Sequence, residues 1–207
     1  MSLTPRTARG TATKERLLAA AEQVFASLGY HDASIVKITE SAGVAMGTFY
    51  LYFESKLQIF EELVEDLNRR VRRAMSEASS QAPNRLAAER AGFRAFFEFT
   101  ARHPGLYRVI RQAEFVSPKA MKMHYERIIR PYAEGLRRAA ERGEIGDVDP
   151  DVAAWALMGM GELIGLRWLL WDSVEDDSVR MPDDVFEHTI NLVERALRPT
   201  APKEHTP

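Results

Sequence analysis

Apolar residues recur at helical spacing along almost all of the 207-residue chain, and this periodicity is the strongest constraint on its fold. Runs that alternate apolar and polar residues, as half-buried strands do, are scarce. Glycine and proline separate the periodic stretches and mark their ends. The pattern predicts an all-α fold of about nine helices, over residues 13–28, 35–42, 45–52, 56–80, 85–102, 106–113, 118–142, 150–171 and 182–197.

The predicted helices change in character near Lys56. Before it, short helices alternate with tight turns, whereas after it the helices are long, as in helical bundles. One long helix that begins at Lys56 would bridge the two parts. We expect a flexible basic arm at 1–12, a small helical domain at 13–56, a larger helical domain at 57–198 and a disordered tail at 199–207.

Composition restricts the kinds of site that this chain can carry. It has no cysteine, which excludes disulfides, thiolate metal sites and cysteine nucleophiles. The first ten residues, MSLTPRTARG, lack the apolar segment of a secretory signal, so we expect a cytoplasmic protein. Residues 152–171 are apolar enough to span a bilayer but include Glu162 and Arg167, so we expect a buried helix and no membrane partner.

Residues 34–53, SIVKITESAGVAMGTFYLYF, have the layout of a helix-turn-helix. The second helix of such a unit lies in the DNA major groove while the first crosses the backbone. This second helix ends in five large apolar or aromatic residues at 49–53, although a surface helix normally buries one face. Phe49 and Phe53 share a face, so the residues between them point partly or wholly elsewhere. From spacing alone, a corner in an ordinary all-α core explains the unit equally well.

A resemblance to a known family covers roughly residues 13–64, which look like the DNA-binding domain of TetR/AcrR-type transcriptional regulators. The shared features are an alanine-rich first helix ending in F-A-x-x-G-Y, then S-I-x-x-I, A-G-V, G-T-x-Y-x-Y-F and S-K. The resemblance implies an N-terminal three-helix DNA-binding domain and a C-terminal helical ligand-binding and dimerisation bundle. It also implies a small N-terminal core of Leu17, Val24, Phe25, Ile38, Val44, Phe49 and Phe53. Such regulators are usually repressors.

The resemblance implies double-stranded DNA contacts residue by residue. The matching positions on the reading helix are Met46, Gly47, Thr48, Tyr50, Leu51 and Tyr52; Lys56 matches a phosphate contact, and Ser34 and Lys37 lie where the preceding helix meets the DNA backbone. Tyrosine hydroxyls and the lysine can bind phosphate oxygens and so position the protein. Met46 and Leu51 can make only apolar contacts, for which a thymine methyl is the expected target.

The sequence departs from the common family pattern just before the reading helix. Family members often carry Ser-Lys there, whereas this chain has Ala45-Met46. The groove surface therefore lacks one hydroxyl and one cation, and its attraction to phosphate should be weaker. We expect an N-terminal basic stretch to add affinity without specificity, through Arg6, Arg9, Lys14 and Arg16.

Helix-turn-helix regulators usually bind DNA as two-fold dimers on half-sites roughly 34 Å apart. In the 152–171 helix, three glycines would allow close backbone approach, and bulky residues flank them. Together with the last helix it could form a four-helix interface, and the resemblance implies the same two helices. We predict a homodimer whose interface includes Trp155, Gly159, Gly161, Gly165, Trp168, Phe186, Ile190 and Val193. The alternative is that these residues form the core of one protomer.

The middle helices are rich in aromatic residues and methionines. Most such stripes are plain core, but the resemblance implies a small-molecule cavity among these helices, and ligand cavities are mainly apolar with a few polar groups. We expect a hydrophobic or acyl-bearing effector whose binding opposes operator binding. The candidate lining residues are Phe93, Phe96, Phe97, Tyr107, Arg111, Phe115, Met123, Tyr125 and Trp155.

Two other classes of function compete with this interpretation. An enzyme is disfavoured because the histidines form no H-E-x-x-H pattern, and neither a glycine-rich phosphate loop nor G-x-S-x-G is present. We therefore predict no catalytic residue, no cofactor and no metal site. A dimeric helical interaction module without an effector would explain the long helices but not the first 56 residues, and it stays as the alternative.

Overall fold

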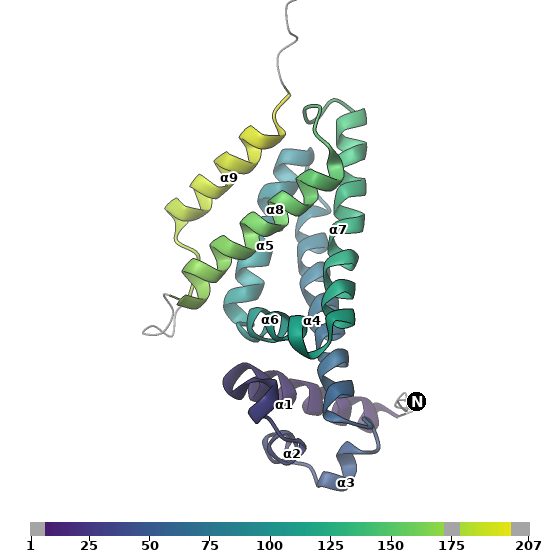
Figure 1. The fold of residues 1–207 in the computed structure, drawn as a ribbon. Coiled ribbons are helices and arrows are strands. Elements are labelled where there is room, and N and C mark those ends of the chain that lie inside the picture. The colour runs from purple at the N-terminus through teal and green to yellow at the C-terminus, as the bar shows by residue number, and fades with distance from the viewer. Residues whose placement is uncertain (1–6, 172–178, 200–207) are drawn as a thin grey trace, which may run out of the picture. The chain divides into compact units, whose positions relative to one another are not determined.

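A computed structural model describes residues 7–171 and 179–199 of the chain (Figure 1). Within those residues it contains nine α-helices, one π-helix and no strand, which confirms the predicted all-α class. The elements are α1 (Ala8–Asp32), α2 (Ile35–Ala42), α3 (Met46–Phe49), α4 (Lys56–Ser79), α5 (Arg85–Arg102), α6 (Gly105–Val116), α7 (Pro118–Glu141), α8 (Pro150–Gly165), η1 (Leu166–Trp171) and α9 (Asp183–Leu197). Residues 1–6 of the predicted arm and 200–207 of the predicted tail lie outside the described residues.

The chain divides into two compact units. The first comprises residues 1–70 and 103–125, and so holds α1 to α3, most of α4, α6 and the start of α7. The second comprises residues 71–102 and 126–207, with α5, most of α7, α8, η1 and α9. The first unit thus includes α6, a helix that the sequence analysis placed with the C-terminal domain. A domain boundary after Lys56 stays a prediction.

The first helix begins earlier and ends later than its periodicity indicates. Its N-cap is Thr7, whose side chain accepts a hydrogen bond from the Gly10 amide, so the helix begins at Ala8 and not at the predicted residue 13. At its far end, the helix continues to Asp32 across a kink at Gly29, whose φ of 78° is left-handed. Glycine tolerates this conformation because it has no Cβ. Residues 8–12 of the predicted flexible arm are therefore helical.

Three later elements also differ from the predicted ranges. The reading helix α3 is a single turn, and the residues up to Tyr52 continue as i→i+3 turns, such as the bond from the Leu51 amide to the Thr48 carbonyl. Helix α7 is continuous through Pro131 and ends at Glu141, one residue before the predicted end. The last six residues of the predicted 150–171 helix form the π-helix η1.

Each unit has an aromatic core of its own. In the first, Phe25 packs against Phe60 with ring centroids 5.3 Å apart. In the second, Phe97 packs against Phe186 at 6.4 Å. The core predicted for the N-terminal domain is buried as expected except for Val44, which is half-buried.

Candidate nucleic-acid interface

The turn between α2 and α3 is fixed by backbone geometry that the sequence encodes locally. Ser34 caps α2 by accepting a hydrogen bond from the Lys37 amide at 3.2 Å. Gly43 ends α2 with φ 62° and ψ 42°, the left-handed conformation that glycine adopts most readily. The Val44 amide then donates to the Thr39 carbonyl at 3.0 Å. These bonds set the direction in which α3 leaves the turn.

Arg16 on α1 holds the same turn from the side. Its Nη2 donates to the Ala42 carbonyl at 2.6 Å and to the Gly43 carbonyl at 3.1 Å. A cation at the C-terminus of a helix also interacts favourably with the helix dipole. Arg16 is part of the basic stretch expected to bind DNA, whereas the structure gives it a role inside the small helical domain predicted at 13–56, here called the reading head.

The reading helix divides its residues between core and solvent. Phe49 and Phe53 are buried with their ring centroids 5.5 Å apart, which confirms that they share the inner face. On the outer face, Met46 and Tyr50 are each 51% exposed and Leu51 is 59% exposed. Gly47 is exposed with nothing within 4 Å of the position a Cβ would take, whereas Thr48 and Tyr52 are half-buried. Three large, largely apolar side chains therefore project from α3 and from the turn that follows it.

The lysines predicted to bind phosphate already donate to backbone carbonyls. Lys56 Nζ lies 2.7 Å from the carbonyl oxygens of both Tyr30 and Ala33, and 4.4 Å from the centroid of the Tyr30 ring. Lys37 Nζ donates to the Asp32 carbonyl at 3.1 Å. Both lysines tie the end of α1 to the elements that follow it. Their role as phosphate contacts stays a prediction.

We expect Arg16→Met to weaken operator binding about tenfold without changing its salt dependence. Hydrogen bonds from a charged donor contribute about 1.5–3 kcal/mol, and their loss should loosen the α2–α3 turn. A residue that contacts phosphate directly would instead lower the salt slope by about one. The measurement is operator affinity across a salt series. Arg9→Met, an exposed cation in the first turn of α1, is the control that should change the slope. A reduced slope for Arg16→Met would contradict the role in the turn.

Comparison with known proteins gives a family match for the N-terminal segment. The profile described as "Bacterial regulatory proteins, tetR family" matches residues 17–63, the segment that contains α2, α3 and the turn between them. Over 198 residues the chain is 28% identical to the uncharacterized HTH-type transcriptional regulator YdgC of Bacillus subtilis, covering 92% of this chain and 95% of that protein. Residues 17–63 therefore match the DNA-binding domain of the TetR family. The proteins that the chain resembles are transcriptional regulators and not enzymes.

Solved structures of TetR-family proteins share the fold over most of the chain. The fatty acid degradation regulator FadR from Bacillus halodurans has a TM-score of 0.78 at 21% identity, covering 92% of this chain and 96% of that one. The transcriptional regulator FadR from Bacillus subtilis, solved in complex with stearoyl-CoA, has a TM-score of 0.74 at 24% identity, covering 86% and 96%. At these identities the likeness shows a common fold, with an N-terminal helix-turn-helix domain and a helical C-terminal domain.

Several residues predicted for a dimer interface pack inside the protomer instead. Phe186, Ile190 and Val193 on α9 are at most 3% exposed, and Gly161 lies against Phe93, whose Cε1 would be 3.3 Å from an added Cβ. Gly165 is also buried and Trp168 half-buried. These buried residues belong to the core of one protomer, which was the alternative to the predicted dimer interface. Trp155 is 51% exposed, and no atom lies within 4 Å of the position that a Cβ on Gly159 would take.

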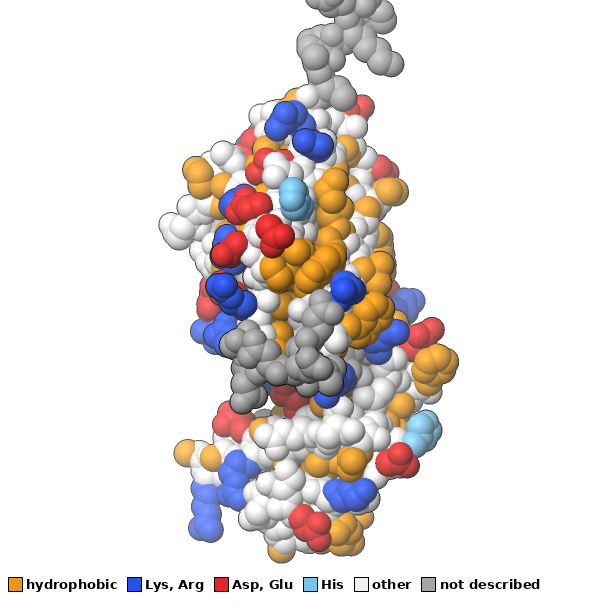
Figure 2. Space-filling view, turned by 90° about the vertical axis from the view of Figure 1, so that its left-hand side faces the viewer, with side chains coloured by type: hydrophobic (Ala, Val, Ile, Leu, Met, Phe, Trp, Pro, Cys, Tyr) orange, Lys and Arg blue, Asp and Glu red, His pale blue; other side chains and the backbone are white. Residues whose placement is uncertain are grey.

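The exposed side of α8 carries an apolar stripe that the sequence analysis missed. Val152 and Leu163 are each 67% exposed, and Ala156 and Gly159 lie between them at helical spacing. Leu192 of α9 is 53% exposed. Figure 2 shows hydrophobic side chains gathered on the side of the second unit that carries α9. Residues 152, 156, 159 and 163 follow the 3.6-residue helical period, and this spacing could have revealed the stripe from the sequence.

This stripe belongs to the one described helix that could span a membrane by length and composition, Pro150–Trp171. Only 33% of its most apolar 18-residue window is buried, so the expectation of a buried helix holds for one of its faces. The described residues leave the other face uncovered.

The predicted ligand residues fall into both units. Phe93 and Phe97 are buried in the second unit and Tyr107 in the first, while Phe96, Met123 and Tyr125 are half-buried. Phe115 is 82% exposed, so its prediction as the lining of an enclosed cavity is wrong; Arg111 and Trp155 are exposed as well. The helical period alone did not separate the two faces of α6. Among the described residues, no group of three or more His, Asp or Glu side chains could hold a metal ion.

Proposed function

We propose that this protein is a TetR-family regulator, a cytoplasmic homodimeric repressor that leaves its operator when a hydrophobic or acyl-bearing small molecule binds. The observation that carries the operator contact is the reading helix, which exposes Met46, Tyr50 and Leu51 beside the fixed α2–α3 turn. The N-cap of α3, Ala45, makes no side-chain hydrogen bond, and α3 adds no cation to this surface. The proposed operator contacts therefore depend on tyrosine hydroxyls and on apolar contact with thymine methyls.

The homodimer is proposed from the uncovered face of α8 and α9. Contiguous apolar surface on a soluble protein marks an interaction site, and two-fold symmetry is the usual arrangement for helix-turn-helix regulators. A second copy of the chain presents the same stripe, so the two faces can cover each other in an isologous contact. Trp155 and Leu163 would then lie in the interface, with Gly159 allowing close approach of the two α8 helices.

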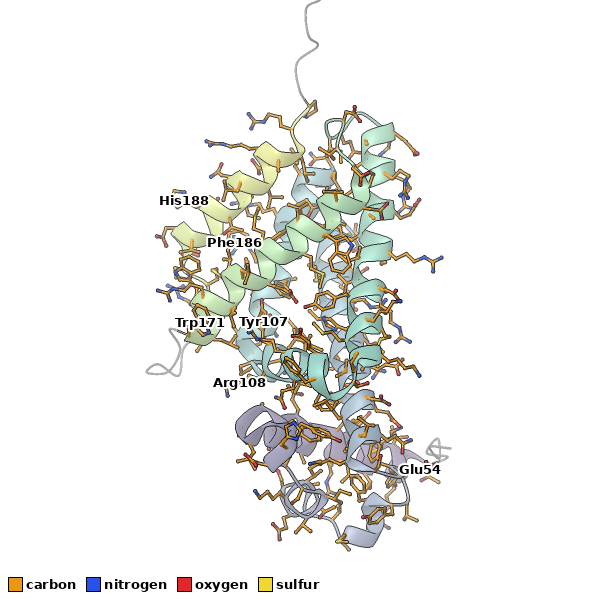
Figure 3. The ribbon with its side chains drawn as sticks, in the orientation of Figure 1. Glu54, Tyr107, Arg108, Trp171, Phe186 and His188 are labelled. Atoms are coloured by element: carbon orange, nitrogen blue, oxygen red, sulfur yellow. The ribbon has the colours of Figure 1, made fainter. Side chains whose placement is uncertain are left out.

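The effector class is proposed from the aromatic cluster of the second unit and from a structural neighbour. Phe93, Phe96 and Phe97 of α5 gather beside Gly161 of α8, and Phe97 packs against Phe186, which is labelled in Figure 3. Aromatic surroundings of this kind suit an apolar ligand. The Bacillus subtilis FadR with the same fold was solved with stearoyl-CoA, which supports long-chain acyl-CoA as the first ligand to test.

We expect thymine-to-uracil replacement at contacted operator positions to weaken wild-type binding about fourfold per methyl group, from the ~0.8 kcal/mol that one buried carbon contributes. The same replacement should have little effect on the Leu51→Ala variant, because the side chain that meets the methyl is gone. The operator would first be selected from a random double-stranded library, and affinities measured by fluorescence anisotropy. Equal responses of both proteins to uracil would contradict the proposed methyl contact.

The effector proposal has a separate test on the same selected operator. Stearoyl-CoA should lower operator affinity, and by reciprocal linkage the operator should lower affinity for stearoyl-CoA. Free coenzyme A is the matched control without an acyl chain. If stearoyl-CoA does not change operator affinity, this effector class is wrong. If the library yields no operator, the interaction-module alternative is favoured over the repressor.

A further inference from the structure

Gln112 of α6 joins its side-chain amide to the kinked end of α1, within the first unit. Its Nε2 donates to the Phe25 carbonyl at 3.1 Å, and its Oε1 accepts from the Tyr30 amide at 2.6 Å. Between these two residues lies Gly29, at the kink. The same helix carries Arg108, labelled in Figure 3, whose Nη1 is 3.5 Å from the Ala26 carbonyl. Because a kink interrupts the intrahelical hydrogen-bond ladder, α6 supplies both a donor and an acceptor where α1 changes direction.

A second attachment holds the beginning of α6 against α1. A Cβ added to Gly105 would lie 2.8 Å from Glu22 Cγ, so only glycine allows this approach without movement of Glu22. The Glu22 carboxylate pairs with Arg70 of α4 at 3.1 Å, and Arg70 Nη2 lies 2.9 Å from His103 Nδ1. Helix α6 is thus fixed to α1 at two points, which limits how far Gln112 can move relative to the kink.

The segment that Gln112 holds is also the one that anchors the reading head. The Tyr30 amide is bound by Gln112, while the Tyr30 carbonyl accepts from Lys56 Nζ at 2.7 Å. Lys56 is the first residue of α4, directly after the α3 turn. Four residues beyond Tyr30, Ser34 caps α2. A displacement of Tyr30 therefore affects the start of α2 and the start of α4 together.

We propose that Gln112 is a positioning residue for operator binding. From α6 it fixes the kinked end of α1, and through Tyr30 it sets the position of the α2 N-terminus and of Lys56. The residue is not a DNA contact, because both ends of its amide are bound to α1. This inference rests on operator binding by the reading head, and its test is arranged so that the two can fail separately.

The test compares Gln112→Met, which keeps side-chain length but has no strong donor or acceptor, with wild type and with Gln112→Glu. Glutamate keeps an acceptor for the Tyr30 amide but turns a carboxylate oxygen toward the Phe25 carbonyl. Glu114→Met, an exposed change on the same helix, is the matched control. Operator affinity is measured well below each thermal midpoint and across a salt series, and hydrogen exchange is followed for the amides of residues 30–38.

Gln112→Met is expected to raise the operator Kd about fivefold to tenfold, with an unchanged salt slope and faster exchange at residues 30–38. Gln112→Glu should restore protection of the Tyr30 amide and part of the affinity, and Glu114→Met should behave as wild type. A lower midpoint for Gln112→Met with unchanged Kd would overturn the inference, because the role would then be structural only. A wild-type protein that selects no operator would instead overturn the proposed function.

Discussion

Replacing Leu163 with glutamate is expected to convert the proposed homodimer into monomers and to lower operator affinity roughly a hundredfold or more. Leu163 is 67% exposed on α8 and lies on the stripe with Val152 and Gly159. In the proposed interface, two-fold symmetry would bring two new carboxylates into an apolar contact. Removing unpaired charges from water costs several kcal/mol each, which favours the separated protomers.

The loss of affinity follows from the loss of the link between two reading heads. In a dimer, binding of one half-site raises the effective concentration of the second head at the other half-site, and this multiplies affinity by large factors without new contacts. Monomers bind each half-site independently. Sedimentation equilibrium at micromolar concentration would measure the association state, and anisotropy would measure affinity for whole and half operators.

Ala78→Glu is the matched control for this substitution, since it adds the same charge at an exposed position of α4 outside the stripe. It should remain dimeric and bind the operator as wild type does. A Leu163→Glu protein that stays dimeric would contradict the placement of the interface on α8. A wild-type monomer at micromolar concentration would contradict the homodimer itself.

The second large effect is expected from Glu89→Ala, which should destabilise the second unit by about 3–5 kcal/mol. Glu89 is 4% exposed, and its Oε1 accepts from Arg85 Nε at 2.7 Å while its Oε2 accepts from the Tyr132 hydroxyl at 2.5 Å. Removing the carboxylate leaves the largely buried Arg85 guanidinium and the part-buried Tyr132 hydroxyl without their acceptor. Such uncompensated groups are more damaging than the net contribution of the intact pair.

The protonation of Glu89 should also make the destabilisation by Glu89→Ala depend on pH. Burial raises the pKa of the Glu89 carboxyl, and this outweighs the opposite effects of Arg85 and of the Tyr132 hydrogen bond. Between the pKa of Glu89 in the unfolded state and its raised pKa in the folded state, the folded protein binds more protons than the unfolded protein. The free energy of unfolding of the wild type therefore falls as pH rises through this window. The stability difference between wild type and Glu89→Ala should therefore shrink with rising pH across that window.

Chemical unfolding at several pH values would measure both effects. Glu134→Ala removes an exposed carboxylate of α7 that pairs with Arg137 and Arg138, and it should change stability by less than about 1 kcal/mol. A Glu89→Ala protein as stable as this control would show that the buried cluster contributes little.

The helices of the fold could be predicted because glycine, proline and short polar caps mark most of their ends. Helix α2 begins and ends at the predicted residues, since Ser34 and Gly43 each make the expected local bonds. The end of α1 could not be predicted in the same way. Gly29 resembles a stop signal, but the helix continues because Gln112, 82 residues further along the chain, binds the Tyr30 amide there. Tertiary contacts of this kind leave no local pattern.

The candidate site was predictable where one face had to be buried and less so elsewhere. The i, i+4 spacing of Phe49 and Phe53 identified the inner face of the reading helix, and the exposure of Tyr50 and Leu51 follows from it. For α9 the same reasoning could not separate a protomer core from an interface, because both require an apolar face. Phe186 therefore proved to be core, whereas Leu192 on another face of the same helix is exposed.

The engagement of basic residues inside the reading head has a consequence for how the protein finds its operator in a genome. Lys14 pairs with Glu62, and Arg16, Lys37 and Lys56 donate to backbone carbonyls. These four cations therefore already stabilise the fold of the domain. Sequence-independent affinity for DNA comes almost entirely from cations at phosphates. We expect a head whose described cations are held in this way to slide along DNA only briefly and to be retained less by unrelated sites. A larger share of its copies would then be free in solution, and a smaller cellular pool would keep one operator occupied.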